Sequence, residues 1–183
     1  MPSPIIILPG IGNSSPSHWQ SLWQQDRPGS IRLAPSSWDE PQLSDWLAAI
    51  EHAIETAGEP PVLVAHSLSC LLVAHWARVS SSKVLGAFLV AVPDPRSSVF
   101  PKAAATFTDV PQQRLPFPAL AIASADDPFG SEDYARTCAR NWGAGLVVAG
   151  ALGHIGETSG VGAWKQGRDL LTAFLAGTGT AAD

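Results

Sequence analysis

A serine, an aspartate and a histidine in this sequence are of the types that together activate a nucleophile. Ser67, Asp127 and His154 each come shortly after an apolar segment of the kind that forms buried strands. A serine hydroxyl is a weak nucleophile until a neighbouring imidazole takes its proton, and a carboxylate can hold that imidazole in the required tautomer. If the chain brings these side chains together, Ser67 could attack a carbonyl carbon and form a covalent acyl intermediate.

The residues around Ser67 form a loosened G-x-S-x-G pattern, in which Ala65 and Ser69 stand at the glycine positions. In such a nucleophile elbow the serine lies in a strained turn between strand and helix, and its neighbours are small because backbone and helix crowd there. The next backbone N–H, that of Leu68, would point at a developing oxyanion, and the helix N-terminus favours negative charge. A serine that begins a helix is also a common N-cap, so this segment alone leaves both interpretations open.

Short apolar segments alternate with helical patterns along the whole chain. The strand-like segments are 4–8, 30–33, 62–64, 84–92, 118–123 and 145–149, and the helical patterns are 16–23, 43–54, 68–77, 131–142 and 163–175. Ser15 and Pro16 read as the N-cap and first residue of the first helix. The alternation predicts an α/β three-layer αβα sandwich with a six-stranded, essentially parallel sheet. The proline-rich residues 93–117 leave room for a short helix and no large cap domain.

The polar residues collect where a parallel sheet places its ligands, beyond the carboxyl ends of the strands. Ser67, Asp127 and His154 all follow strand-like segments, in the chain order Ser, Asp, His of the α/β-hydrolases. Three coincidences of type and position favour a catalytic Ser67 over a simple N-cap. A second oxyanion donor is expected in the loop after the first segment, at the backbone N–H of Ile11, because its two glycine neighbours allow an unusual backbone path.

Three aspartates compete for the role of the acid. Asp127 precedes Pro128, which restricts the preceding residue and should hold the Asp127 carboxylate in place. Asp126 is expected to bond turn amides or to face solvent. Asp94 follows the fourth apolar segment, a position that sometimes supplies the acid in related folds, but the prolines on either side favour a turn. We therefore predict Asp127 as the acid.

Other residues with chemical potential have structural interpretations as well. His66 adjoins Ser67 in the turn, so its side chain should diverge from the serine, and we expect a packing or hydrogen-bonding role. His18 and Trp19 are candidates for the pocket wall, with the helix surface as the alternative for His18 and the core for Trp19. The remaining histidines and the cysteines are expected to be structural: His52, His75, Cys70 and Cys138.

The sequence predicts chemistry without a cofactor or a metal ion. The segment from Gly10 to Ser15 lacks the third glycine of a dinucleotide-binding loop, and no group of histidine, cysteine and carboxylate residues has metal-ligand spacing. The net charge of −5, without a basic stripe, argues against a nucleic-acid partner and against binding to a membrane surface. No leader-like or long apolar segment is present, so the default expectation is a cytoplasmic location.

Length and composition are those of one compact domain. The chain has 183 residues, of which 45% are hydrophobic and 15% charged, against about 25% charged in an average domain. A chain of this size buries roughly 70% of its unfolded surface around a single core. We predict one domain over residues 1–176 and a flexible tail over residues 177–183.

The sequence resembles the small α/β-hydrolase-fold serine hydrolases, the family that includes retinoblastoma-binding protein 9, and more closely its bacterial members. The resemblance rests on a Leu8-Pro-Gly10 loop followed by His18-Trp19, the His66-Ser67 elbow, Asp126 to Phe129, and Gly153-His154. It implies a minimal hydrolase sheet of strand order 2-1-3-4-5-6 and a triad of Ser67, His154 and Asp127. It also implies a hydrolase whose physiological substrate is generally unassigned. Ala65 and Ser69 depart from the glycines that are frequent in the elbow of this family.

Together these features predict a serine hydrolase, most simply a carboxylesterase that acts on small acyl esters through an acyl-enzyme. The same triad would also serve a thioesterase, or a hydrolase of small peptides or aminoacyl compounds. An alternative of another class is a binding protein that keeps the fold without catalysis, because fold does not imply function. The sequence predicts a small-molecule substrate and leaves a protein partner unknown.

Overall fold

The computed structural model describes residues 3–179, and its centre is a parallel sheet. The strands are β1 (Ile5–Leu8), β2 (Ile31–Arg32), β3 (Val62–His66), β4 (Gly86–Val90), β5 (Ala119–Ala123) and β6 (Gly145–Val148). They form one six-stranded sheet in the order β2-β1-β3-β4-β5-β6, and every neighbouring pair is parallel. The predicted sheet and the strand order implied by the resemblance are both confirmed.

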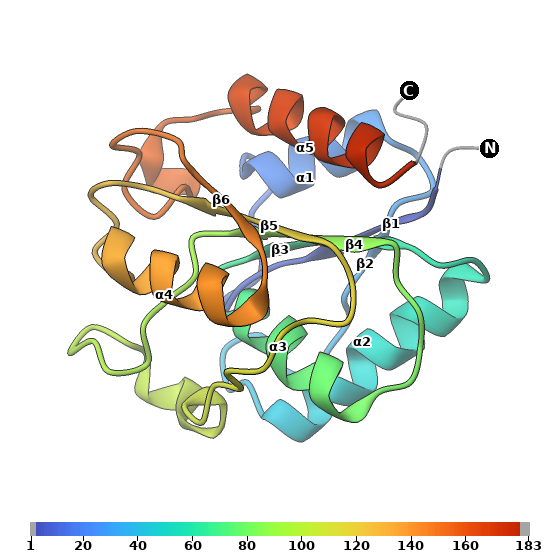
Figure 1. Ribbon diagram of the computed structural model, residues 1–183, viewed down its shortest axis with the longest axis horizontal. Coiled ribbons are helices and arrows are strands. Elements are labelled where there is room, and N and C mark those ends of the chain that lie inside the picture. The colour runs from blue at the N-terminus through green and yellow to red at the C-terminus, as the bar shows by residue number, and fades with distance from the viewer. Residues whose placement is uncertain (1–2, 180–183) are drawn as a thin grey trace.

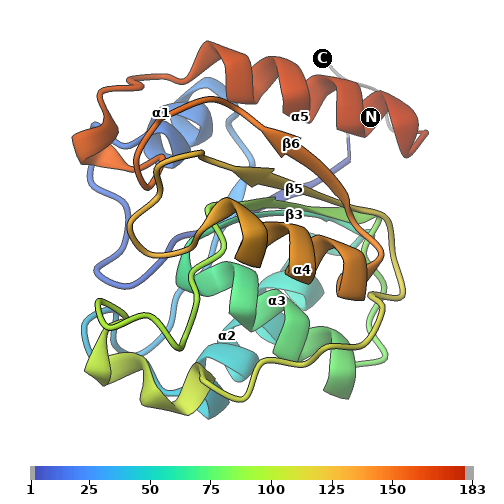
Figure 2. The same cartoon turned by 60° about the vertical axis from the view of Figure 1, so that its left-hand side comes forward.

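Helices cover both faces of this sheet, as Figures 1 and 2 show. The α-helices are α1 (Trp19–Asp26), α2 (Leu43–Ala57), α3 (Leu68–Val79), α4 (Glu132–Trp142) and α5 (Lys165–Gly177). Helices α1 and α5 lie on one face, and α2, α3 and α4 lie on the other (Figure 2). The three-layer αβα sandwich is therefore confirmed. Two short 3₁₀ helices complete the elements: η1 (Lys102–Phe107) and η2 (Glu157–Ser159).

The sheet is apolar on both faces because each face packs against helices. Along β1, Ile6 and Leu8 join the core under α2, α3 and α4, whereas Ile5 and Ile7 join the core under α1 and α5. Successive side chains of a strand point to opposite faces, so a strand between two helical layers needs a continuous apolar run. Burial of each large side chain stabilises the folded state by about 1.5–3 kcal/mol. The packed strands therefore hold the polar residues at their ends in fixed positions.

The first helix starts later than its sequence pattern predicts, so the prediction of Ser15 as its N-cap is wrong. Helix α1 begins at Trp19, and its N-cap is His18, whose Nδ1 accepts the Gln20 N–H at 3.1 Å. Ser15 belongs to the turn before the helix, where its carbonyl accepts the His18 N–H at 3.1 Å. An imidazole nitrogen can satisfy one of the free N–H groups at a helix start, as a serine oxygen does.

The segment between β4 and β5 carries only η1, so the expectation of no large cap domain is confirmed. At the other end of the chain, α5 ends at Gly177, the first residue of the predicted tail, and residues 180–183 lie outside the described part of the chain. Within residues 3–179 we find no helix of the length and apolarity needed to span a membrane.

The sheet topology determines where a site can form. The chain leaves β1 toward β2 on one side and returns to β3 on the other side of β1, so the strand order reverses between β1 and β3. Loops that leave the carboxyl ends of two such strands diverge and open a crevice. The crevice here lies beyond Leu8 and His66, the last residues of β1 and β3.

Candidate active site

Ser67 occupies a strained elbow between β3 and α3. Its φ of 55° and ψ of −123° are unusual for a residue other than glycine, and such a conformation costs about 1–3 kcal/mol. The backbone is held by a hydrogen bond from the Ser67 N–H to the Val90 carbonyl at 2.9 Å. The Ser67 side chain makes no capping bond to α3. The N-cap interpretation therefore fails, because the hydroxyl is directed to another partner.

The surroundings of the elbow are as crowded as the small residues of the sequence suggest. Ala65 and Ser69 are both completely buried. A Cβ added to Gly10 would lie 3.0 Å from the Ser67 Cβ, so the loop after β1 comes very close to the elbow. Ser69 donates its hydroxyl to the Pro9 carbonyl at 2.5 Å and so connects α3 to this loop.

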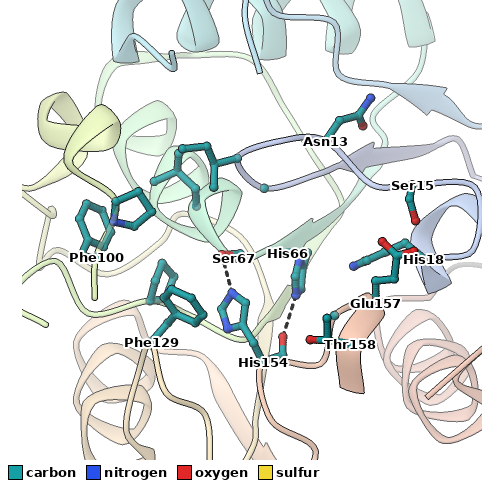
Figure 3. A pocket seen from close by; sticks show the side chains of 16 residues that line it. Asn13, Ser15, His18, His66, Ser67, Phe100, Phe129, His154, Glu157 and Thr158 are labelled. Carbon is teal, nitrogen blue, oxygen red and sulfur yellow. Dashed lines mark hydrogen bonds between the residues drawn. The ribbon is translucent and has the colours of Figure 1, made fainter. Parts of the chain in front are cut away.

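The side chains of Ser67, His154 and Asp127 form a continuous chain of hydrogen bonds. The Ser67 hydroxyl donates to His154 Nε2 at 2.7 Å (Figure 3). The other ring nitrogen, His154 Nδ1, lies 2.9 Å from both Asp127 Oδ1 and Oδ2. The Asp127 side chain is only 2% exposed and that of His154 18% exposed. A buried carboxylate on Nδ1 sets the tautomer in which Nε2 can accept the serine proton.

Asp126 is the neighbour of Asp127 in the chain, but it bonds the loop that precedes His154. Asp126 Oδ1 accepts the Gly153 N–H and the Ser124 hydroxyl, both at 2.8 Å. The Gly153 N–H and then the Ser124 hydroxyl hold the pKa of Asp126 below its usual value. Ser124 Oγ also accepts the Leu152 N–H at 2.8 Å. Asp126 thus bonds an amide of the loop that precedes His154 and does not touch the imidazole.

Asp94, the third candidate acid, has a different partner. Its carboxylate accepts bonds from Arg96 Nε and Nη2, each at 3.0 Å, and from the Arg96 backbone N–H at 2.9 Å. An aspartate that bonds the amide two residues ahead closes a local turn. The flanking prolines predicted this turn.

Two further side chains fix the backbone around His154. His66 Nε2 donates to the His154 carbonyl at 2.9 Å (Figure 3), so its ring diverges from the serine as predicted. Trp19 Nε1 donates to the Ile155 carbonyl at 2.8 Å. Trp19 is 1% exposed and is not among the described residues that line the pocket, so its assignment to the pocket wall is corrected. As the first residue of α1 it faces the sheet, in the core under α1 and α5.

Two buried histidines near Ser67 and His154 have lowered pKa values and are neutral at pH 7. Burial lowers the pKa of His18 to about 4. Burial, with the His154 and His18 imidazoles nearby, holds the pKa of His66 well below its usual value. The ring centres of His18 and His66 are 4.9 Å apart, and those of His66 and His154 are 5.1 Å apart. The two imidazoles beside His154 therefore carry no positive charge at this pH.

A pocket of about 300 Å³ opens at Ser67 and His154. Phe100 and Phe129 lie on one side of the pair, and His18 and Glu157 lie on the other (Figure 3). The pocket therefore has an apolar end and a polar end. Its lining is made of Gly10, Ile11, Asn13, Ser15, His18, His66, Ser67, Leu68, Pro93, Phe100, Pro101, Phe129, His154, Gly156, Glu157 and Thr158.

Both predicted oxyanion donors lie in the wall of this pocket. Ile11 comes from the loop after β1, and Leu68 is the first residue of α3. Within residues 3–179, neither backbone N–H has a hydrogen-bond acceptor. The loop around Ile11 is fixed by bonds from the Gly12 N–H to the Trp38 carbonyl at 2.9 Å and from the Asn13 N–H to the Gly10 carbonyl at 3.2 Å. Two free N–H groups beside a nucleophile could bind an anionic oxygen.

The residues expected to be structural lie outside the pocket lining. Cys70 and Cys138 are buried free thiols, and His75 bonds the Phe107 carbonyl at 3.3 Å. His52 is exposed on α2. In the described part of the chain, no three histidine, cysteine, aspartate or glutamate residues are grouped so that they could hold a metal ion.

Sequence reasoning missed two polar side chains that support the site, the buried Gln20 and the exposed Glu157. Gln20 is fully buried, and its amide nitrogen donates to the Leu8 and Val64 carbonyls, each at 3.1 Å. It thereby connects α1 to the last residue of β1 and to the middle of β3. Glu157, at the polar end of the pocket, accepts the Ser17 hydroxyl at 2.7 Å. Neither residue belongs to a motif, so its position could be found only from the tertiary structure.

Comparison with known proteins agrees with this geometry. Residues 5–173 match the family described as serine hydrolase. The chain belongs to the serine hydrolase family. No match is found among curated proteins.

Solved structures give the same fold. A protein described as a YdeN-like hydrolase from Pectobacterium atrosepticum is 28% identical with a TM-score of 0.86, and the match covers 96% of this chain and 92% of that one. The ydeN gene product from B. subtilis is 22% identical with a TM-score of 0.78, over 95% and 99% of the two chains. A structure described as a thermophilic esterase is 15% identical with a TM-score of 0.75, over 99% and 92%. The serine hydrolase has an α/β-hydrolase fold.

Proposed function

We propose that this serine hydrolase is a carboxylesterase that cleaves small acyl esters with Ser67, His154 and Asp127 as its triad. The observation that carries the proposal is the chain of hydrogen bonds from Asp127 through His154 to Ser67, at 2.9 Å and 2.7 Å. Its nucleophile stands in a strained elbow and opens into a pocket. The strain supports a functional role, because a plain helix start would relax to an ordinary conformation.

In the first half of the proposed reaction, His154 Nε2 takes the hydroxyl proton as Ser67 Oγ attacks the ester carbonyl carbon. The carbonyl oxygen becomes an oxyanion, which the N–H groups of Ile11 and Leu68 would bind. Asp127 holds the Nδ1–H and stabilises the imidazolium. His154 then returns the proton to the leaving alkoxide, the C–O bond breaks, and the acyl group stays on Ser67.

In the second half, a water molecule takes the place of the alcohol. His154 removes a proton from this water, whose oxygen attacks the acyl carbon and forms a second oxyanion in the same position. Collapse of this intermediate breaks the bond to Ser67 Oγ, which recovers its proton from His154. The carboxylic acid leaves and the free enzyme returns.

The size of the pocket supports short acyl groups. A volume of about 300 Å³ lies at the lower end of small-molecule sites, and only η1 stands where a helical lid would be inserted. We expect kcat/KM for p-nitrophenyl esters to be highest with short acyl chains and to fall with length, because a long chain would extend into water. Measurement from C2 to C16 checks this, and a maximum at C12 or above would contradict it.

Substrates that differ only in the atom bonded to the acyl carbonyl carbon test the choice of substrate class. An oxygen ester, a thioester and an amide of one short acyl group present the same oxyanion but different leaving groups. We expect the highest kcat/KM for the oxygen ester. A thioester or amide preferred by more than about tenfold, or 1.4 kcal/mol in barrier, would replace the carboxylesterase with one of those hydrolases. A folded protein that turns over none of them would favour a binding protein.

A further inference from the structure

We propose that Ser69 is a positioning residue whose hydroxyl holds the oxyanion loop, defined here as residues 9–12, in register with the nucleophile. The proposal rests on the proposed function, because it concerns the two N–H groups that would bind the oxyanion. Leu68 is part of α3, whereas Ile11 belongs to the loop after β1. Pairing of β1 with β3 brings the two segments together at the sheet edge, and the position of Ile11 relative to Leu68 beyond that edge depends on how the loop is attached to the helix.

One hydrogen bond makes this attachment. Ser69 lies in the first turn of α3, two residues after Ser67, and it is completely buried. Its Oγ donates to the carbonyl of Pro9 at 2.5 Å. Among the described residues, this is the one hydrogen bond between the oxyanion loop and α3. Pro9 comes directly after β1 and two residues before Ile11, so the bond fixes the loop close to the proposed donor.

The other hydrogen bonds of the loop and of the strand before it are made to parts of the molecule other than α3, and β1 itself is paired with β3 as far as Leu8 and Ala65. Gln20 of α1 holds the Leu8 carbonyl, before the loop. The Gly12 N–H bonds the Trp38 carbonyl, at the far end of the loop. Gly10 lies against the Ser67 Cβ. This is a van der Waals contact, which does not orient the Ile11 N–H as a hydrogen bond would. The Ser69 hydroxyl therefore supplies the one directional bond from the loop to the helix of the nucleophile.

An elbow with glycine at this position has no side chain with which to make this bond. In this chain the serine is small enough to fit the crowded turn and still supplies a donor. An oxyanion hole acts only when its donors lie about 2.7–3.1 Å from the oxygen that becomes charged. A misplacement of about 1 Å can cost roughly 10²-fold in rate. Loss of the bond should thus weaken transition-state binding more than substrate binding.

We expect Ser69→Ala to lower kcat on a short acyl ester by about 10- to 100-fold, with KM within about twofold of the parent. Ser69→Gly should show the same loss, because it also lacks the hydroxyl, and it gives the same comparison if the alanine variant does not fold. Ser80→Ala is the matched control. Ser80 follows the last turn of the same helix, far along α3 from Ser67, and donates its hydroxyl to Glu51 at 2.9 Å. We expect this variant to lose thermal stability and to keep kcat.

A trifluoromethyl ketone with the same acyl group gives a readout that does not depend on turnover. Ser67 Oγ adds to its carbonyl carbon, the proton passes to His154, and the former carbonyl oxygen becomes an oxyanion in the proposed hole. Ser69→Ala and Ser69→Gly should weaken this inhibitor by about the same factor as they lower kcat. If a folded Ser69 variant keeps both kcat and the inhibition constant within twofold while its melting temperature falls, the hydroxyl is merely structural and the proposal is overturned.

Failure of this inference can be told from failure of the proposed function. A parent protein that neither turns over esters nor reacts with a fluorophosphonate has no serine hydrolase site, and Ser69 then has nothing to position. A parent that reacts at Ser67 and hydrolyses esters, but is unaffected by loss of the Ser69 hydroxyl, keeps its function and refutes the inference alone.

Discussion

Ser67→Ala and His154→Ala are each expected to lower kcat on a short acyl ester by about 10⁶-fold, the scale of loss when the serine or the histidine of such a triad is removed in subtilisin. The hydroxyl and Nε2 are 2.7 Å apart and would transfer one proton between them. Because they act as a unit, the double variant should lose no more than either single variant. Steady-state kinetics on the purified proteins, with circular dichroism to establish folding, measures all three.

His52→Ala is the control for this comparison. His52 is exposed on α2 and does not line the pocket, so its removal should leave kcat within about twofold. Losses in the single variants that multiply in the double variant would mean that Ser67 and His154 act independently, which contradicts a common proton transfer.

Asp127→Asn is expected to lower kcat by about 10⁴-fold while the protein stays folded. The amide would present an N–H to His154 Nδ1 and favour the wrong tautomer, the cause of a loss of this size in the protease triad. The carboxylate now meets Nδ1 with both oxygens at 2.9 Å. Kinetics on the variant, compared with the parent at the same pH, gives the ratio directly.

Asp126→Asn and Asp94→Asn are the matched controls for the acid. Asparagine at position 126 keeps an oxygen that can accept the Gly153 N–H, and Asp94 contacts Arg96 instead of the imidazole. We expect both variants to stay within about tenfold of the parent, or about 1.4 kcal/mol in barrier. A large loss in Asp94→Asn together with an active Asp127→Asn would show that the acid is misassigned although the fold stands.

The fold could be predicted from the sequence because its strands are continuous apolar runs between helical patterns. That pattern is local, and a parallel sheet covered on both faces is the arrangement that buries it. The meeting of Ser67, Asp127 and His154 at one sheet edge could be predicted for a related reason. Each follows a strand, and parallel strands end at the same edge of the sheet. Asp127 is buried, and its carboxylate lies 2.9 Å from His154 Nδ1.

The details that sequence reasoning missed depend on contacts between distant parts of the chain. Gln20 donates to the Val64 carbonyl, and Ser69 donates to the Pro9 carbonyl. No local sequence pattern predicts either partner. Trp19 was a candidate for the pocket wall because it follows the glycine-rich loop. Because α1 begins only at Trp19, this side chain faces the core instead. Serine and histidine can both cap a helix, so the choice of His18 was decided by the tertiary structure.

Labelling with a fluorophosphonate tests the central claim most directly, because the reagent reacts with a serine only where a base has activated it. We expect the native protein to be modified at Ser67, as located by mass spectrometry of its peptides. Ser67→Ala should remain unmodified, and His154→Ala should react far more slowly than the parent. A folded parent that is not modified, or that is modified at a different serine, would contradict the assignment of Ser67 as the nucleophile.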